Sequence, residues 1–266
     1  MLGAIAGDVI GSTYEFRSAT SKSFELFPEG SRPTDDSILT LAVAEWLMGE
    51  TELVPAFKRA VARHPRAGWG GMFRRWGASD DAEPYNSFGN GSAMRVSPVG
   101  FAFSTLDETL EAAKQSAEVT HNHPEGIKGA QATAAAIFLA RAGSAPDDSR
   151  GEIASRFGYD LSWSVDDIRP AYGFDETCQG SVPEAITAAL ESTGYEDAVR
   201  NAISLGGDAD TQASIAGGIA QAMHGGVPEE IRRQALDLLQ PKMRETVQGF
   251  RSEEHTSELQ SHAPIS

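Results

Sequence analysis

The sequence predicts an all-α protein that forms a compact single domain, an orthogonal bundle of helices. Helix-start residues followed by apolar residues three and four positions apart recur along most of the 266 residues. Candidate strands, by contrast, are short and scattered. No internal repeat or linker divides residues 1–250, and a chain of this length can bury one sizeable core. We therefore expect one helical domain.

The N-terminal part predicts three helices. Residues 1–11 are small and mostly apolar and predict a buried helix, which a polar loop over residues 12–30 follows. Residues 32–37 combine Pro, Thr and two Asp, a typical helix start, and predict a central helix after them. A third helix is expected over residues 54–64, and the proline at position 65 ends it.

The middle of the chain begins with a long irregular segment. Residues 66–99 are rich in glycine, aromatic and polar residues, and a long segment of this kind inside a domain is usually functional. Amphipathic or alanine-rich patterns then predict helices over residues 106–120, 125–143 and 146–157.

The C-terminal part predicts further helices and a tail. Ser181 and Glu184 have the spacing of a capping box, which predicts a helix over residues 183–192. Residues 228–239 predict the last amphipathic helix. Residues 251–266 are polar, resemble a stretch that recurs at the ends of unrelated assembled sequences, and are expected to be a disordered, non-native tail.

Composition narrows the classes of partner. The chain has 38 acidic and 22 basic residues, a net charge of −16, so no general attraction to nucleic acids or anionic membranes is expected. Cys178 is its only cysteine, which excludes an intrachain disulfide and fits a reducing compartment. The N-terminus lacks the basic region of a signal peptide, and the longest apolar run, residues 130–142, is too short to span a bilayer. A cytoplasmic monomer is expected.

Candidate chemistry concentrates at residues 204–225, where two glycines precede Asp208, Asp210 and Thr211 and a helical pattern follows. Carboxylates two residues apart cannot share one helix face, so we expect Asp208 in the incoming turn and Asp210 at or near the N-cap. Two carboxylates and a hydroxyl aimed at one point are hard oxygen ligands that suit Mg²⁺ or Mn²⁺. The alternative for an aspartate at a helix start is an ordinary cap. An EF-hand is excluded, because the required glycine and glutamate are missing.

Thr34, Asp35 and Asp36 offer the same chemistry at the start of another helix. If the two helix starts come together, they form a binuclear divalent site of oxygen ligands at helix N-termini. Carboxylates at 4 Å repel by roughly 1 kcal/mol per pair even in water, whereas a helix dipole relieves only about 0.3–1 kcal/mol. Two divalent cations would cancel the four charges. If the two clusters lie far apart instead, both are ordinary caps.

Five motifs occur in a characteristic order. They are Gly7-Asp8 with Gly11 and Glu15, Thr34-Asp35-Asp36, the run from Gly89 to Arg95, Thr120-His121, and the run from Gly206 to Thr211. Together they resemble the ADP-ribosylglycohydrolase family over about residues 1–250. The resemblance implies an all-helical fold, a binuclear Mg²⁺ or Mn²⁺ site, and hydrolysis of the N- or O-glycosidic bond at C1″ of the distal ribose of ADP-ribose.

The resemblance also implies roles for individual residues. Two Mg²⁺ or Mn²⁺ ions would be held by Thr34, Asp35, Asp36, Asp208, Asp210 and Thr211. Glu15 matches an acid on a mobile loop over the site, and the catalytic candidates that would take a proton from an activated water are Glu15, Asp36 and Asp208. A phosphate-facing loop and a histidine near the adenosine ribose supply the substrate-binding candidates: Asn86, Ser87, Phe88, Gly89, Asn90, Gly91, Ser92 and His121.

Several readings stay open at this point. Phe88 would stack on adenine or only pack, and Asp8 would support the metal ligands or cap a helix. His121 and His123 have a spacing compatible with zinc, but no cysteine or third histidine lies nearby.

The expected function is that of a metal-dependent ADP-ribosyl hydrolase acting on a modified protein or small molecule. The linkage it cleaves stays open among arginine, serine, acetyl ester, nucleobase and ADP-ribose. A binuclear nucleotide phosphohydrolase is the alternative enzyme and would release phosphate. A non-catalytic ADP-ribose-binding or structural relative is the third possibility.

Overall fold

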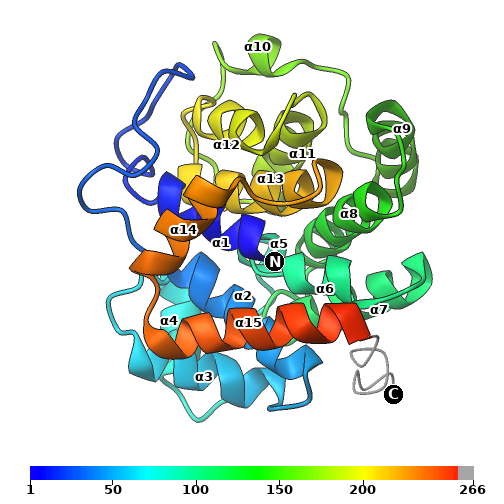
Figure 1. Ribbon diagram of the computed structural model, residues 1–266. Coiled ribbons are helices and arrows are strands. Elements are labelled where there is room, and N and C mark those ends of the chain that lie inside the picture. Colours follow the sequence, from blue (N-terminus) through cyan, green and yellow to red (C-terminus); the bar gives the residue numbers. More distant parts are fainter. Residues whose placement is uncertain (257–266) are drawn as a thin grey trace.

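Helices account for all the regular secondary structure in residues 1–256, the range that the computed structural model describes, with side chains described through Ser252 (Figure 1). Within that range, β-structure is limited to one isolated bridge between Gly89 and Thr177. These observations confirm the all-α class expected from the sequence.

Three helices from distant parts of the chain occupy the centre of the molecule: α1 (Leu2–Gly11), α2 (Asp35–Leu47) and α13 (Ala209–Met223) (Figure 1). α13 is buried along most of its length, because α8 (Pro124–Arg141), α11 (Cys178–Leu190) and α12 (Tyr195–Ile203) also pack against it. The small side chains of α13 permit these close contacts.

The contact between α1 and α13 depends on glycines spaced four residues apart on one face of α1. A Cβ atom added to Gly3, Gly7 or Gly11 would collide with the backbone of α13. Only glycine therefore permits this separation of the two helices. As a result, α1 sets the position of α13 relative to everything else that α1 contacts.

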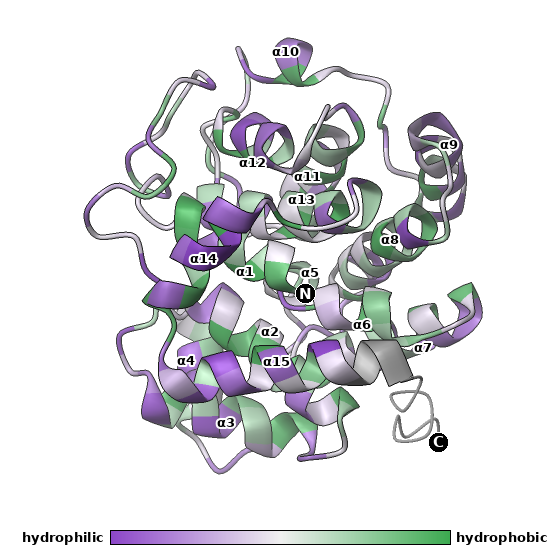
Figure 2. Ribbon diagram, viewed as in Figure 1, coloured by the Kyte–Doolittle hydropathy of each residue, from purple (hydrophilic) through white to green (hydrophobic). Residues whose placement is uncertain are grey.

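A second group of helices packs around α2. α3 (Leu53–Arg63) and α15 (Pro241–Thr256) lie against it at the bottom of the view in Figure 1. The central helices are coloured mainly in the apolar range, whereas α9 (Pro146–Phe157) and α14 (Glu229–Leu238) carry many hydrophilic residues (Figure 2). The remaining helices are α4 (Gly71–Gly77), α5 (Gly91–Met94), α6 (Ser97–Ala102), α7 (Leu106–Glu118), α9 (Pro146–Phe157), α10 (Val165–Ile168) and α14 (Glu229–Leu238).

The helix predicted from the Ser181–Glu184 capping box has a different start. α11 begins at Cys178, and its N-cap is Thr177, whose hydroxyl accepts a hydrogen bond from the Gly180 amide at 3.1 Å. Ser181 instead donates to the Thr177 carbonyl at 2.6 Å. The predicted capping box is therefore wrong, because the proline that suggested a first turn lies inside the helix.

Two other expectations about helices were wrong. Residues 66–99 are not one irregular segment, because α4, α5 and the start of α6 interrupt them. Residues 228–239 form α14 as expected, but α15 follows and buries Met243, Val247 and Phe250. α15 continues to Thr256, beyond the domain end expected at residue 250. The rest of the expected tail, residues 257–266, lies outside the described residues.

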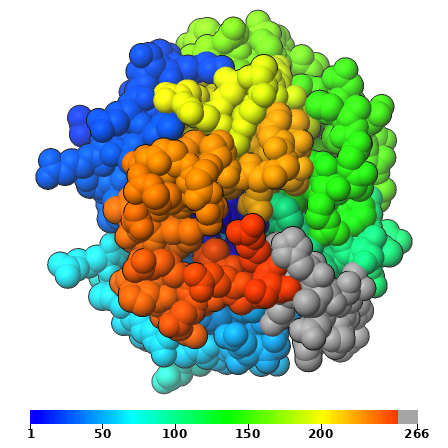
Figure 3. Space-filling model, viewed as in Figure 1, coloured from blue at the N-terminus to red at the C-terminus, as the bar shows by residue number. Residues whose placement is uncertain are grey.

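α14 and α15 cover the central part of the face seen in Figure 3, and the dark blue N-terminal segment is visible in a hollow between them. The hollow corresponds to a pocket lined by Met1, Gln221, Arg232 and Phe250, among others. The N-terminal amine donates to the Gln221 carboxamide oxygen at 3.2 Å, which holds the start of α1 there. Over residues 1–256, the helices are all too short or too polar to cross a membrane.

Candidate metal centre

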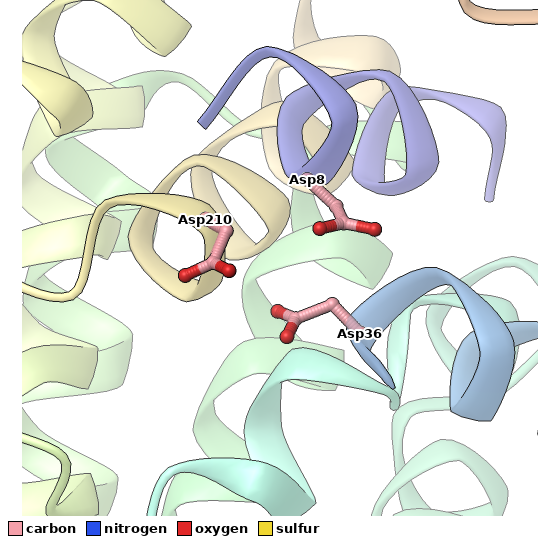
Figure 4. A group of neighbouring side chains, drawn as sticks. All are labelled: Asp8, Asp36 and Asp210. Carbon is pink, nitrogen blue, oxygen red and sulfur yellow. The ribbon is translucent and has the colours of Figure 1, made fainter. Parts of the chain in front are cut away.

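The three central helices bring carboxylates together that are far apart in the sequence. Asp8 of α1, Asp36 of α2 and Asp210 of α13 are all buried and point toward one another (Figure 4). Each offers an oxygen within 4.8 Å of the others. Glu15, Asp208 and Asp210 form a second such group. The two helix starts singled out in the sequence therefore lie side by side, and Asp210 belongs to both groups.

Asp8 differs from the other acids because its carboxylate is already fully engaged. It accepts hydrogen bonds from the Thr34 hydroxyl at 2.6 Å and from the Thr34 and Ser37 amides, each at 3.0 Å. The Ser37 hydroxyl donates to it as well. Asp8 thus caps the start of α2 from a neighbouring helix, which fixes the position of Asp36 relative to α1 and α13.

Asp36 has the opposite character. Its Oδ1 atom is buried and has no hydrogen-bond partner in the described part of the chain. Burial, followed by the charge of Asp8, raises the pKa of Asp36 well above its ordinary range. A buried carboxylate oxygen without a donor is costly unless a cation binds it, so Asp36 fits a divalent ion.

The second helix start has a slightly different register from the one expected. Asp208, not Asp210, is the N-cap of α13, and Asp210 lies in the first helical turn. Asp208 accepts a hydrogen bond from the Asn90 side-chain amide at 2.7 Å. Burial raises the pKa of Asp208, and burial together with the charges of Asp36 and Asp208 raises the pKa of Asp210 well above its ordinary range.

Two further acids are less enclosed. Burial, with a smaller contribution from Asp208, raises the pKa of Glu15 to about 7. Burial and the charge of Asp8 likewise raise the pKa of Asp35 to about 7. Within residues 1–252, neither these two nor the other four acids form an ion pair with lysine or arginine. The donor set is therefore rich in oxygen and holds no ion-paired cation, although the charge of Arg32 acts on Glu15. Such a set suits Mg²⁺ or Mn²⁺.

A pocket of about 350 Å³ opens onto these carboxylates. Its lining includes Glu15, Asp35, Asp36, Asp208, Asp210 and Thr211. Thr34 does not line it, because its hydroxyl donates to Asp8 and accepts from the Asp36 amide at 3.3 Å. Of the six predicted metal ligands, five thus face the pocket and Thr34 supports the helix start.

The predicted substrate-binding residues divide in the same way. Ser87, Gly89, Asn90, Gly91 and His121 line the pocket, whereas Asn86, Phe88 and Ser92 do not. Phe88 is 44% exposed and packs against His123, with ring centroids 5.3 Å apart. Ser92 is buried and donates to the Gly126 carbonyl at 2.7 Å. Asn86 has a φ of 55°, and its amide donates to the Asn122 side chain at 2.8 Å.

Two amides of the glycine-rich loop already form hydrogen bonds within the protein. The Gly89 amide donates to the Ser87 hydroxyl at 3.1 Å, and the Asn90 amide donates to the Glu176 carbonyl at 2.8 Å. Because the Asn90 side chain also holds Asp208, this loop supports the acidic cluster directly. A phosphate-binding role for the loop stays a prediction.

His123 is already committed to helix capping, which weakens the zinc alternative. Its Nδ1 atom accepts a hydrogen bond from the Glu125 amide at 3.1 Å at the start of α8. The metal-compatible groups found among the described residues contain acids and no histidine.

The sequence assigned no role to several pocket residues, among them Tyr85, Arg95, Phe174 and Glu176. Arg95 is the last residue of the run from Gly89 to Arg95. Its position as a cation directly after small and apolar residues is a signal that could have identified it. Phe174 stacks on Phe16, which is 82% exposed and follows Glu15, with centroids 6.3 Å apart. No pattern in the sequence pairs these two aromatic residues.

The fold and the site together define a helical protein with a buried cluster of carboxylates that could hold metal ions. The chain belongs to the ADP-ribosylglycohydrolase family, whose model matches residues 1–259. It is 26% identical to the ADP-ribosylhydrolase ARH3 of Gallus gallus over 308 residues, covering 85% of this chain and 84% of that protein. It is also 26% identical to the ADP-ribosylarginine hydrolase Tri1 of Pseudomonas putida (strain GB-1) over 270 residues, covering 86% and 71%.

A solved structure supports the fold independently. A chain of an ADP-ribosylglycohydrolase-related protein complex superposes with a TM-score of 0.67 at 22% identity, covering 98% of this chain and 97% of that one. The likeness extends over nearly the whole of both chains.

Proposed function

We propose that this protein is a metal-dependent hydrolase that cleaves the glycosidic bond at C1″ of the distal ribose of ADP-ribosylated proteins or small molecules and releases ADP-ribose. The observation that carries the proposal is the meeting of Asp36, with its unpartnered oxygen, and Asp210 beside an open pocket. Family membership supports the class of substrate.

The residues that would hold two Mg²⁺ or Mn²⁺ ions are Asp35, Asp36, Asp208, Asp210 and Thr211, with Thr34 beside them. Divalent ions bound there would supply Lewis-acid chemistry, polarising ribose oxygens and lowering the pKa of water. Asp8 would act indirectly, because its hydrogen bonds hold the start of α2 in place.

Glu15 is the favoured proton acceptor. Its pKa of about 7 leaves it able to take a proton near neutral pH, and a base is most effective when its pKa lies near the working pH. In the proposed reaction a water oxygen bonds to C1″, the bond from C1″ to the leaving group breaks, and the leaving group gains a proton. Asp36 and Asp208 remain the other candidates for the base.

The names of the relatives suggest which linkages to test first. One relative is named an ADP-ribosylarginine hydrolase and others are named ADP-ribosylhydrolases, so arginine-linked and other ADP-ribosyl bonds form a natural panel. Asp210→Asn serves as the inactive control, because Asp210 belongs to both acidic groups and its loss should abolish turnover.

The experiment incubates the protein with arginine-, serine- and acetyl-linked ADP-ribose, with Mg²⁺, with Mn²⁺ and with chelator. Chromatography should show free ADP-ribose only with a divalent ion and only with the unmodified protein. Release of phosphate instead would favour the phosphohydrolase alternative. Binding of ADP-ribose without turnover of any substrate would favour a non-catalytic role.

A further inference from the structure

Arg95 is the largest fully buried side chain in the described part of the protein, and it forms no ion pair there. Its guanidinium carbon lies 4.6 Å from the centre of the Phe57 ring, while Nε and Nη1 have no hydrogen-bond partner. Nη2 donates to the Ser116 carbonyl at 2.8 Å and to the Thr120 hydroxyl at 2.9 Å. Because no acid neutralises Arg95, its burial must have a purpose other than forming an ion pair.

The contact of Thr120 with its neighbour supplies that reason. The Thr120 hydroxyl lies 2.8 Å from Nδ1 of His121 and has, among the described residues, only that atom and Arg95 Nη2 as hydrogen-bond partners. Arginine can only donate, so the hydroxyl accepts from Arg95 and keeps its own hydrogen to donate. If Nδ1 carried a hydrogen, the buried hydroxyl hydrogen would have no acceptor. Nδ1 of His121 is therefore the acceptor, and the ring hydrogen is on Nε2.

Nε2 of His121 lies at the wall of the pocket. His121 lines that pocket, and within the described residues Nε2 has no hydrogen-bond partner. A Cβ atom on Gly91 would come within 3.1 Å of Nε2, so glycine keeps the space beside this atom clear. Burial and the nearby charge of Arg95 lower the pKa of His121 well below its ordinary value, which keeps the ring neutral.

We propose that Arg95 and Thr120 are positioning residues that fix His121 as a neutral hydrogen-bond donor, with its hydrogen on Nε2 directed at an acceptor oxygen of the ligand in the pocket. The ligand in this statement rests on the proposed function, since ADP-ribose carries hydroxyl, ether and phosphate oxygens that can accept. The fixed tautomer rests on the hydrogen bonds alone.

The tautomer is measurable without any substrate. Long-range ¹H–¹⁵N spectra of histidine-labelled protein distinguish the two ring nitrogens, and the His121 signal is the one lost in His121→Gln. We expect hydrogen on Nε2 in the unmodified protein, a shift toward the other tautomer in Thr120→Val, and recovery in Thr120→Ser. Hydrogen on Nδ1 in the unmodified protein would overturn the proposal, whether or not Thr120→Val folds.

Binding provides a readout that a purely structural role of Thr120 would not move. Calorimetry should show that Thr120→Val weakens ADP-ribose binding by about 3- to 10-fold, the range expected for one neutral hydrogen bond, and raises KM more than it lowers kcat. Thr120→Ser should recover the lost affinity. Equal affinity of Thr120→Val and the unmodified protein would show that Arg95 and Thr120 do not position His121 for ligand binding. A hydrogen fixed on Nε2 in a protein that binds no ADP-ribose would support the positioning by Arg95 and Thr120 and contradict the proposed function.

Discussion

Carboxylates of the same type have opposite roles in the acidic cluster. Asp8 accepts four hydrogen bonds, from the amides and hydroxyls of Thr34 and Ser37, and so holds two helices together. Burial raises the pKa of Asp8 as well, but these hydrogen bonds act against that rise. Asp36 and Asp210 are buried next to like charges, and their pKa values are raised well above the ordinary range. Without a cation, ionising either acid destabilises the fold, because the charge would be buried beside like charges.

This difference predicts effects of opposite sign for the same substitution. In chelator-treated protein at pH 8, Asp210→Asn should raise the free energy of unfolding by about 1 kcal/mol, because it removes an acid that is costly to bury beside like charges, whether it ionises or keeps its proton. Asp8→Asn should lower it by about 2 kcal/mol or more, since an amide oxygen cannot replace all the lost hydrogen bonds. Denaturant unfolding measures both, and Asp210→Asn should also lose ADP-ribose release by more than about 100-fold. A lower apo stability for Asp210→Asn would contradict this account.

A half-buried acid outside the cluster gives a test of pH dependence away from the candidate metal centre. Burial raises the pKa of Glu184 on α11 from its ordinary 4.5 to about 7. Below pH 4.5 the side chain is protonated in both the folded and the unfolded state. Between about 4.5 and 7 the unfolded chain releases the proton while the folded protein keeps it, so stability is lost as the pH rises through this window.

Glu184→Gln should therefore raise the Tm relative to the unmodified protein at pH 8 and leave it almost unchanged at pH 4. The exposed Glu29→Gln serves as control and should show no such pH-dependent difference. Thermal unfolding at both pH values tests this, and an equal effect of Glu184→Gln at pH 4 and pH 8 would rule it out.

At the scale of the helix, the spacing of the two acidic helix starts depends on the glycine face of α1. Gly7→Ala would place a methyl group against the α13 backbone, where no side-chain movement can relieve the clash. We expect a loss of about 1–3 kcal/mol in the free energy of unfolding, together with weaker divalent binding.

The matched control is Gly151→Ala in α9, where nothing lies within 4 Å of the added atom. This substitution should stabilise by about 0.5–1 kcal/mol, because alanine is the better helix former. If both variants had the same effect, the α1–α13 contact would not depend on glycine.

Sequence patterns located the chemistry better than the helix boundaries. The acids at both helix starts were recognisable from their position before apolar helical runs, and the structure brings them together. The start of α11 was missed because Pro183 suggested a first turn, although Thr177 provides the actual cap. α15 was missed because three buried apolar residues are diluted by many charged ones. The Arg95–Thr120–His121 chain could not be read from sequence, since it depends on a tertiary contact between residues 25 apart.

For the whole molecule, the boundary of the native domain is open to direct test. Phe250 is 1% exposed, whereas Arg251 and Ser252 are exposed. A chain ending at Phe250 should therefore keep its Tm within about 2 °C and its activity. A chain ending at Gly249 should lose about 3–5 kcal/mol of stability, because it lacks the buried ring. Equal melting of the two truncated chains would show that Phe250 does not anchor α15.

A monomeric state stays a prediction that size-exclusion chromatography of the same samples would test.

The excess of acid over base runs through the molecule and is concentrated in its pocket. The net charge is −16, and the acids around Asp36 and Asp210 form no ion pair with lysine or arginine in residues 1–252. The pocket lining also includes Arg75 and Arg95, but its acids outnumber them, so bound cations would favour an anionic substrate such as ADP-ribose. Cation binding and substrate binding are therefore linked in this account.

The most direct test of the account is a calorimetric titration of chelator-treated protein with Mn²⁺. We predict saturable binding of about two ions per chain in the unmodified protein and a marked loss of binding in Asp210→Asn, since Asp210 belongs to both acidic groups. Absence of binding to the unmodified protein at millimolar Mn²⁺ and Mg²⁺ would contradict the assignment of a divalent metal centre.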